Sequence, residues 1–392
     1  MIVGVVNETF PGEARVAIVP ISLAALGKAG ATVLIESGAG QAAGHPDSEY
    51  EEKGARITAS RAAVFAEADV VAQVRGLGAN PERGRGDLEH MRRGQMLVAM
   101  FDPLSSPEAV REVADRGVTL LALEMIPRIT RAQSMDVLSS MATVAGYKAV
   151  LIAATSLPKM FPMMMTAAGT IAPARVFVVG VGVAGLQAIS TARRLGAVVE
   201  AYDVRPAVAE QVQSLGAKFV ELGLDASHAE GAGGYAKALG EEFYVRQREV
   251  MTQVVAANDV VITTAAVPGK KAPLLVTEDM VNGMRAGSMV VDLAAERGGN
   301  CELTRPGETV VHRGVSIVGP LNLAATVPFH ASQMFAKNVT TLLLHLIRDG
   351  NLTLKLDDEI DRETAIAHGG EVRNDRVREA LGMAATGTGG KS

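Results

Sequence analysis

A glycine-rich hexamer at residues 180–185, GVGVAG, has the residue types and spacing that bind the pyrophosphate of a dinucleotide. Gly180 permits a tight turn, Gly182 lets the backbone approach the pyrophosphate, and Gly185 allows close packing of the following helix. That helix, which we expect to start at Gly185, attracts phosphate charge with its amino terminus. Glycine hexamers also occur by chance, but here an apolar strand precedes the motif and a second strand ends at Asp203. The residues predicted to bind the dinucleotide are Gly180, Gly182, Val183, Ala184 and Gly185.

Asp203 lies eighteen positions after Gly185, where an acidic side chain can accept hydrogen bonds from the adenosine ribose hydroxyls. The same carboxylate repels a 2′-phosphate, so NAD(H) is favoured over NADP(H). Arg205 could in principle meet a phosphate, but beside Asp203 we interpret it as a solvated loop arginine. We expect Asp203, Val204 and Arg205 to line the adenosine end of the site.

Two later strand ends should complete the pocket, because ligands of open α/β sheets lie outside the carboxyl ends of strands. They are the segments 263–269 (TTAAVPG) and 292–294 (DLA), whose small residues leave room for a ribose and a nicotinamide ring. The predicted contacts are Thr264, Ala265, Ala266, Val267 and Leu293, although ordinary strand-to-helix loops remain an alternative. The segment 231–235 (GAGGY) suits a lid that closes over nucleotide through Gly234 and Tyr235, but by itself is more often only a loop.

A polar stretch at residues 124–140, EMIPRITRAQSMDVLSS, lies beside the expected domain junction. Local rules favour a capped helix start, with Ser134 or Asp136 as the cap and Arg128 paired with Glu124. On these rules alone, the stretch needs no ligand to explain it.

The elements that must position these residues form two series of alternating strands and helices, typical of parallel sheets covered by helices. The chain of 392 residues suits two domains of roughly 150–200 residues. We predict an α/β protein with two Rossmann-like doubly wound domains and parallel sheets. The first domain is discontinuous, because a helical stretch after Pro320 returns to pack on it. The predicted domains are residues 1–140 with 325–381 and residues 141–324, with a disordered tail at 382–392. The methionines Met163 to Met165 are expected to fill gaps in a core, with a partner surface as the less favoured alternative.

Composition excludes several classes of function. The formal charge of −5 gives no basic field for nucleic acid. One cysteine and seven scattered histidines indicate no metal site and a reducing compartment. No export signal is visible, and the strictly apolar runs are shorter than the roughly 18–20 residues that span a bilayer. We expect a soluble, cytoplasmic chain.

The series PRITRAQSMDVLSS, AGYKAV, FPMMMTAAGT, VGVGVAGLQAI, RRLGA, YDVR, GAGGYAK, ITTAAVPG, DLAAERGGNC and FAKN covers nearly the whole chain. It resembles the NAD(H)-binding domain I of the proton-translocating nicotinamide nucleotide transhydrogenases. By this resemblance, Arg128, Gln133, Asp136 and Ser139 position the nicotinamide ring, and the loop of Tyr235 is the family's mobile loop. Arg128 and Gln133 would orient the carboxamide and ribose, while Asp136 would hold Arg128 or the amide.

The resemblance also implies a reaction of the Si/Re-specific type without acid/base chemistry. NADH would pass its hydride to NADP⁺ on a separate NADP(H)-binding domain, while membrane-spanning subunits translocate protons. Orientation of the two rings would then supply much of the rate. A homodimer is implied, together with a cytoplasmic place at the inner face of the membrane through partner subunits.

Two alternatives remain. The opening GVVNETFPGEARVAIVP, with Arg15, resembles alanine dehydrogenase, but that enzyme uses a lysine and a histidine in its first domain. Gln73 and Arg75 stand near the lysine position, no histidine stands near Phe101, and Glu296 replaces an expected aspartate, so the proton transfers have no evident agent. Arg15 would then be a family relic or part of a structural ion pair. The other alternative is a non-catalytic module that senses NAD(H).

Overall fold

The computed structural model describes residues 1–221, 241–266 and 269–384. The chain folds into two compact units. Unit 1 comprises Met1–Met141 and the described residues from Ala324 onwards, and unit 2 comprises Ala142–Leu323. The first unit is therefore built from two separate parts of the chain.

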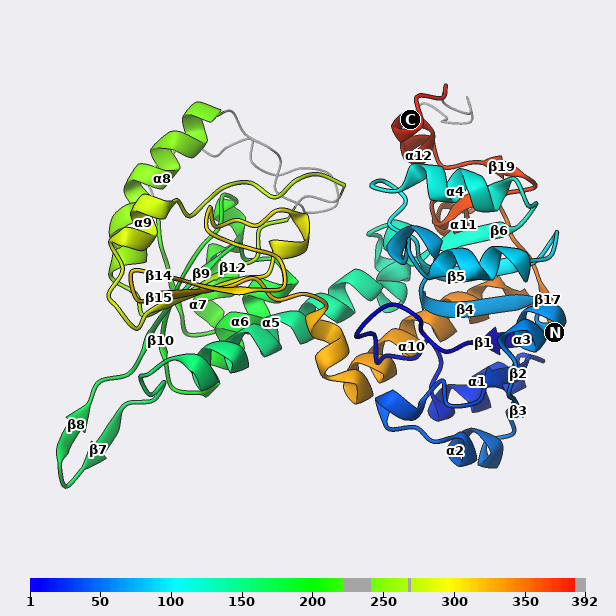
Figure 1. Cartoon of the computed structure of the whole chain (residues 1–392), viewed down its shortest axis with the longest axis horizontal. Helices are drawn as coiled ribbons and strands as arrows, with labels where there is room; N and C mark the ends of the chain where they lie inside the picture. Colours follow the sequence, from blue (N-terminus) through cyan, green and yellow to red (C-terminus); the bar gives the residue numbers. More distant parts are fainter. Residues whose placement is uncertain (222–240, 267–268, 385–392) are drawn as a thin grey trace. The chain divides into compact units, whose positions relative to one another are not determined.

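Unit 1 is organised around an eight-stranded sheet (Figure 1). Its strands, in spatial order, are β19 (Glu371–Val372), β18 (Ala365–His368), β6 (Thr119–Ala122), β5 (Met96–Met100), β4 (Val70–Arg75), β1 (Ile2–Val5), β2 (Thr32–Glu36) and β3 (Arg56–Thr58). The six strands from β6 to β3 are parallel, in the order of a doubly wound fold. Strands β18 and β19 add an antiparallel edge, which is common on otherwise parallel sheets. The prediction of a Rossmann-like domain is confirmed, with this antiparallel edge in addition.

Helices cover the sheet of unit 1. They are α1 (Leu23–Lys28), α2 (Asp47–Glu52), α3 (Arg61–Glu67), α4 (Pro107–Ala114), α10 (Pro328–Leu346), α11 (Glu359–Thr364) and α12 (Asp375–Ala380). Helix α10 buries one apolar face, and the backbone N–H of Val16 donates to the Ser332 hydroxyl on this helix at 3.0 Å. The late helix thus packs on the first domain, as predicted.

Unit 2 has a seven-stranded sheet with the order β11 (Lys218–Phe219), β10 (Val198–Tyr202), β9 (Arg175–Val179), β12 (Val260–Thr263), β13 (Met289–Asp292), β15 (Val315–Val318) and β14 (Thr309–His312). Only the edge strand β14 is antiparallel to its neighbour. The helices of this unit are α6 (Val183–Arg194), α7 (Ala209–Ser214), α8 (Glu241–Ala256) and α9 (Glu278–Asn282), and α5 (Val137–Ser156) leads into it from unit 1. Strands β12 and β13 are buried throughout and β9 is buried after its exposed first residue, Arg175, as expected for a sheet covered on both faces.

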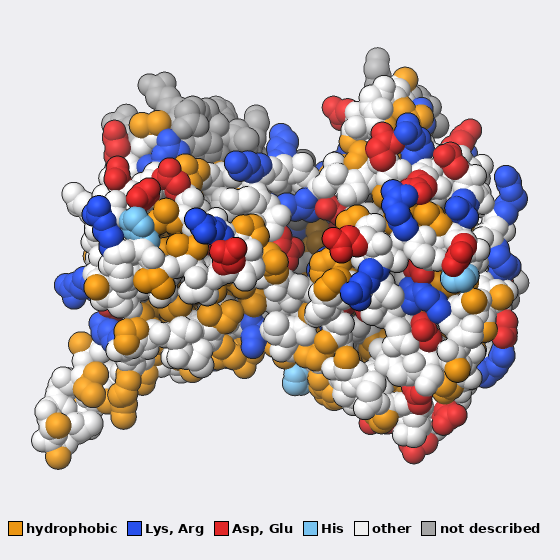
Figure 2. Space-filling model, in the orientation of Figure 1, with side chains coloured by type: hydrophobic (Ala, Val, Ile, Leu, Met, Phe, Trp, Pro, Cys, Tyr) orange, Lys and Arg blue, Asp and Glu red, His pale blue; other side chains and the backbone are white. Residues whose placement is uncertain are grey.

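The methionine-rich segment forms a hairpin of β7 (Met164–Thr166) and β8 (Gly169–Ile171) that extends away from the sheet of its own unit (Figure 1). The two strands pair only with each other, and Met163 and Met165 are 58% and 80% exposed. Apolar side chains lie along this projection (Figure 2). The prediction that these methionines fill a core is wrong, because none of the described elements of unit 2 covers the hairpin.

Among the described residues, α5 alone has the length and apolar composition that could cross a membrane. A third of its most apolar window is buried in the protein. Helices of protein cores pass the same test of length and composition, so this observation is weak evidence for a membrane span.

Candidate functional site

Four neighbouring parallel strands of unit 2 deliver the predicted nucleotide residues to one edge of the sheet. Strands β10, β9, β12 and β13 end at Tyr202, Val179, Thr263 and Asp292, so the loops that follow begin side by side. The order of the strands reverses between β9 and β12, which is the point where open α/β sheets bind ligands. The structure therefore brings the glycine turn, Asp203, Thr264 and Leu293 to a common edge.

The glycine turn has the backbone conformation that the motif requires. Gly180 has φ +95°, and a Cβ atom there would lie 2.7 Å from the Thr264 hydroxyl oxygen. A Cβ atom on Gly185 would collide with the Gly180 carbonyl oxygen. A Cβ atom on Gly182 would meet nothing within 4 Å, so the space above this residue is open. Gly180 and Gly185 shape the turn, whereas Gly182 leaves room for a ligand to approach the backbone.

Helix α6 begins at Val183 with Gly182 as its N-cap, two residues earlier than the sequence predicts. Val183, Ala184 and Gly185 thus form the first turn, where backbone N–H groups have no partner within the helix. These donors and the helix dipole favour an anionic group such as a pyrophosphate.

Asp203 connects the glycine turn to the end of β10. Its Oδ2 accepts the backbone N–H of Val181 at 2.7 Å, and its Oδ1 accepts the backbone N–H of Arg205 at 2.9 Å. The Arg205 side chain donates Nε to Oδ1 and Nη2 to Oδ2, each at 2.8 Å. The interpretation of Arg205 as a solvated arginine is wrong. Its side chain is only 14% exposed, because the planar guanidinium pairs with both oxygens of the carboxylate.

Asn300 anchors the segment after β12, and sequence reasoning did not single it out. Its Oδ1 accepts the backbone N–H of Ala265 at 3.0 Å, and its Nδ2 donates to the Ala265 and Pro273 carbonyls at 2.9 and 2.8 Å. The Thr264 hydroxyl donates to the Gly180 carbonyl at 2.8 Å. Asn300 therefore holds both backbone groups of Ala265, and Thr264 joins this segment to the glycine turn.

Asp292 supports Asn300 from a fully buried position. Its Oδ2 accepts the backbone N–H groups of Asn300 and Cys301 and the Thr304 hydroxyl at 2.7–3.0 Å. Its Oδ1 accepts the Thr263 hydroxyl at 2.9 Å. These donors replace the hydration that the carboxylate loses on burial. The only sequence signal for this network was the polar pair of Asp and Asn within DLAAERGGNC.

In unit 1, the predicted nicotinamide residues lie around the short helix η6 (Thr130–Met135) and the start of α5. Arg128 and Gln133 are exposed. Asp136 caps α5, since its two carboxylate oxygens accept the Ser139 N–H at 2.9 Å and the Ser139 hydroxyl at 2.6 Å. The expectation of a capped helix start is confirmed for Asp136.

Glu124, just before this segment, accepts the backbone N–H groups of Phe101 and Asp102 at 2.7 and 2.6 Å. Desolvation raises the pKa of this carboxyl to about 7, although those two hydrogen bonds act to lower it.

Gly234, Tyr235 and Val267 lie outside the described residues, as does the end of the predicted tail from residue 385.

Arg15, Gln73 and Arg75 belong to an internal charge cluster of unit 1. Arg15 pairs with both oxygens of Glu13, at 2.7 and 2.6 Å, and Arg75 reaches the same carboxylate at 3.1 Å. Gln73 donates to Asp87 at 2.9 Å. Of the two interpretations of Arg15, the structure shows the ion pair.

Two further acidic residues, Glu296 of unit 2 and Glu8 of unit 1, also accept backbone N–H groups. Glu296 accepts the Asn322 N–H at 2.6 Å. Glu8 accepts the N–H groups of Val74 and Arg75, and its desolvation raises the carboxyl pKa to about 8.

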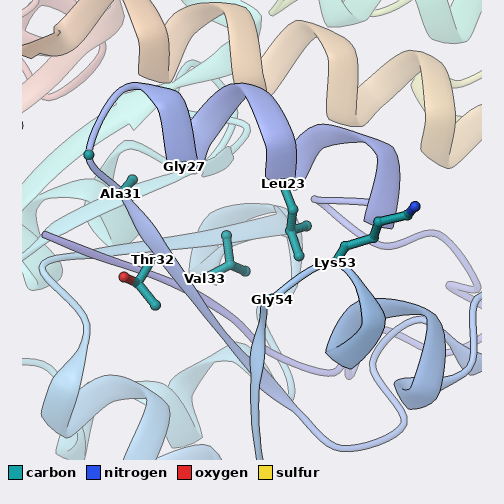
Figure 3. A pocket seen from close by; sticks show the side chains of 8 residues that line it. Leu23, Gly27, Ala31, Thr32, Val33, Lys53 and Gly54 are labelled. Carbon is teal, nitrogen blue, oxygen red and sulfur yellow. The ribbon is translucent and has the colours of Figure 1, made fainter.

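Two cavities among the described residues of unit 1 lie away from these side chains. One, of about 360 Å³, is lined by Leu23, Gly27, Thr32, Val33, Lys53 and Gly54 (Figure 3). It lies at the amino end of β2, and Lys53 extends away from Thr32 (Figure 3). Another, of about 540 Å³, is lined by Asp69 and Gln95, just before β4 and β5. Ligands of doubly wound sheets bind at the opposite, carboxyl ends of strands, so we assign no site to either cavity.

Comparison with known proteins finds similarity along both units. Models described as alanine dehydrogenase/PNT, N-terminal domain and C-terminal domain match residues 4–145 and 149–375. The chain is similar to the first part of NAD(P) transhydrogenase subunit alpha of Rhodospirillum rubrum, with 46% identity over 95% of this chain and 97% of the relative. It is similar to the solved structure of transhydrogenase from Sinorhizobium meliloti, with 45% identity and a TM-score of 0.84 over 95% of this chain and 100% of the other. A more distant relative is alanine dehydrogenase 2 of Staphylococcus aureus, with 29% identity over 87% of this chain and 85% of the relative.

Proposed function

The chain belongs to the alanine dehydrogenase/PNT family, and from this premise we propose that it is the NAD(H)-binding component of a proton-translocating transhydrogenase. The observation that carries the proposal is the similarity to transhydrogenase alpha subunits over almost the whole chain. The reaction is hydride transfer between NADH and NADP⁺, and we assign it to the Si/Re-specific type that the sequence resemblance implies.

We assign NAD(H) binding to residues 141–324. The open space over Gly182, the first turn of α6 and the carboxylate of Asp203 fit a pyrophosphate followed by a ribose without a 2′-phosphate. Ala265, Ala266 and Leu293 continue this edge of the sheet toward the nicotinamide end. Val204 and Arg205 complete the adenosine side.

Residues 1–140 with 325–381 form the other predicted domain. In our proposal, the nicotinamide contacts of this domain come from Arg128, Gln133, Asp136 and Ser139. Bound dihydronicotinamide supplies the hydride. Arg128 and Gln133 orient its carboxamide and ribose, and Asp136 fixes the start of α5 from which Ser139 faces the ligand. No general base is needed, since the residues act by orientation and by excluding water. Hydride transfer should fall in Arg128→Ala and Asp136→Asn at unchanged NADH affinity. Unaltered transfer in both would remove this segment from the mechanism.

The proposed partners are an NADP(H)-binding transhydrogenase domain, which accepts the hydride, and membrane-spanning subunits that translocate protons. The chain would then be cytoplasmic and peripheral to the membrane. We also propose a homodimer, supported by the exposed apolar hairpin β7–β8. Met165→Asp should shift the sedimentation coefficient toward that of a monomer. Val311→Asp, at another exposed apolar position of unit 2, is the matched control.

The charge cluster of unit 1 favours transhydrogenase over alanine dehydrogenase. An oxo-acid substrate needs cationic side chains for its carboxylate, but Glu13 already pairs with both Arg15 and Arg75. Glu13 is fully buried with Arg15, so a substrate carboxylate would have to displace an internal one.

The test follows NADH oxidation in two parallel cuvettes. One contains pyruvate and ammonium, and the other contains an NADP(H)-binding transhydrogenase domain loaded with NADP⁺. Turnover only in the second supports the proposal. Turnover in the first would make the protein an alanine dehydrogenase, and NADH binding without turnover in either would favour a nucleotide sensor.

A further inference from the structure

The short helix η6, which carries Gln133 between Arg128 and Asp136, is tied to a distant part of the chain. The Arg131 guanidinium donates Nη1 to Asp358 Oδ2 at 2.6 Å and Nη2 to Asp358 Oδ1 at 3.0 Å. The two residues are 227 positions apart in the sequence. Such a bidentate pair fixes direction as well as distance, unlike a single contact between point charges.

Asp358 is itself held in place by its neighbours. It is the N-cap of α11, since its Oδ1 accepts the Ile360 N–H at 2.8 Å. Asp361 in the same helix accepts His345 Nε2 at 2.8 Å and the Lys355 N–H at 2.7 Å. The carboxylate that receives Arg131 thus belongs to a hydrogen-bonded junction of α10 and α11. His345, Asp358 and Asp361 are close enough together to suggest a metal site, but the cation at this cluster is the Arg131 guanidinium.

A second tether acts on the same short helix. The buried Asn338 of α10 donates its Nδ2 to the Ser134 carbonyl at 2.8 Å. Arg131 and Ser134 therefore hold the backbone on both sides of Gln133. Beyond this helix, the capping hydrogen bonds of Asp136 fix the chain where α5 begins.

From these contacts we propose that the Arg131–Asp358 ion pair is a positioning device for hydride transfer. It holds the segment from Arg128 to Asp136 in the orientation that aims the nicotinamide ring at its partner. The inference rests on the proposed function and adds to it residues that do not touch the ligand. Displacement of a reacting group by about 1 Å can cost up to about 10²-fold in rate, so a small shift of this segment would be visible.

The test uses Arg131→Gln, Asp358→Asn and the double variant that carries both changes, in the full chain. Asparagine is a good N-cap, so Asp358→Asn preserves the start of α11. The control is Arg56→Gln, which breaks another ion pair of unit 1, with Glu67 at 2.7 Å and comparable exposure of the arginine. We expect roughly tenfold slower hydride transfer at saturating NADH in both single variants. The NADH Kd should stay within about twofold, because the pyrophosphate and adenosine-ribose contacts assigned to unit 2 are unchanged. The double variant should be no slower than the single variants, because both changes break the same pair.

Three results would overturn the proposal. One is a rate in both single variants equal to that of Arg56→Gln. Another is weaker NADH binding with an unchanged rate of hydride transfer at saturating NADH, which would mean that the ion pair contributes to NADH affinity and not to hydride transfer. The last is a double variant in which the two losses of rate multiply, because the two changes would then act independently of the pair.

Hydrogen exchange separates this proposal from the proposed function. Amides of residues 128–139 should exchange faster in the single variants than in the wild type and the control, whether or not the protein turns over. A wild type without transhydrogenation would refute the proposed function. In that case, faster amide exchange in the single variants would still support positioning of this segment by the Arg131–Asp358 pair, and unchanged exchange would overturn it.

Discussion

Replacing Gly182 and Gly185 by alanine should separate ligand binding from folding, although both glycines belong to one motif. In Gly182→Ala, the new methyl group points into open space, with nothing within 4 Å. Alanine is a poorer N-cap than glycine by about 0.5–1 kcal/mol. The smaller conformational entropy of the unfolded chain returns about 0.4–1 kcal/mol. The free energy of unfolding should therefore change by less than about 0.5 kcal/mol.

The same methyl group stands where the pyrophosphate must approach the backbone. Loss of one charge-assisted hydrogen bond costs about 1.5–3 kcal/mol. The NADH Kd should then rise about 10- to 100-fold, which a titration of NADH fluorescence would measure. Gly185→Ala should behave differently, since its methyl group collides with the Gly180 carbonyl oxygen. We expect a loss of about 3 kcal/mol, seen by calorimetry as a melting temperature roughly 6–12 °C lower.

The reasoning would be refuted by a Gly182→Ala protein that binds NADH with the affinity of the wild type. It would equally be refuted by a Gly185→Ala protein that melts like the wild type. The first result would place the pyrophosphate elsewhere, and the second would show that the turn relaxes without cost.

Three further changes test other regions of the structure. Asp203→Ala should raise the NADH Kd roughly tenfold and reduce the preference for NADH over NADPH, because it removes the ribose acceptor and releases Arg205. Fluorescence titration would measure both affinities, with the exposed Glu210→Ala as the control. Asn300→Ala should lower the free energy of unfolding by about 2–3 kcal/mol, measured by urea unfolding, since it leaves both backbone groups of Ala265 unpaired. A decrease below about 0.5 kcal/mol would contradict the role of Asn300 as the anchor of this segment. The folded-state pKa of Glu8 is raised from 4.5 to about 8, so its contribution to stability is complete below pH 4.5 and is lost as the pH rises through 8. Relative to Glu8→Gln, the wild type should lose stability over that interval, and equal pH profiles of urea unfolding would contradict the shift.

Features that depend on local order could be predicted from the amino-acid sequence. Alternating apolar runs and turns indicated two doubly wound domains, and the flanking strands distinguished GVGVAG from a chance glycine hexamer. The cap at Asp136 was also foreseeable, because a side chain and the N–H three residues later meet within one turn. In each case the interacting atoms are a few residues apart or share a repeating pattern.

Which distant groups meet became clear only in the folded chain. Arg205 has no local mark that separates a solvated side chain from one lying across Asp203. Asn300 reaches Ala265 from 35 positions away, and Arg131 reaches Asp358 from 227. The exposure of Met165 was equally hidden, because hydrophobicity indicates that a residue favours burial but not whether another layer is present to bury it. Such contacts arise from the order in which strands and helices pack, which side-chain spacing along the chain does not encode.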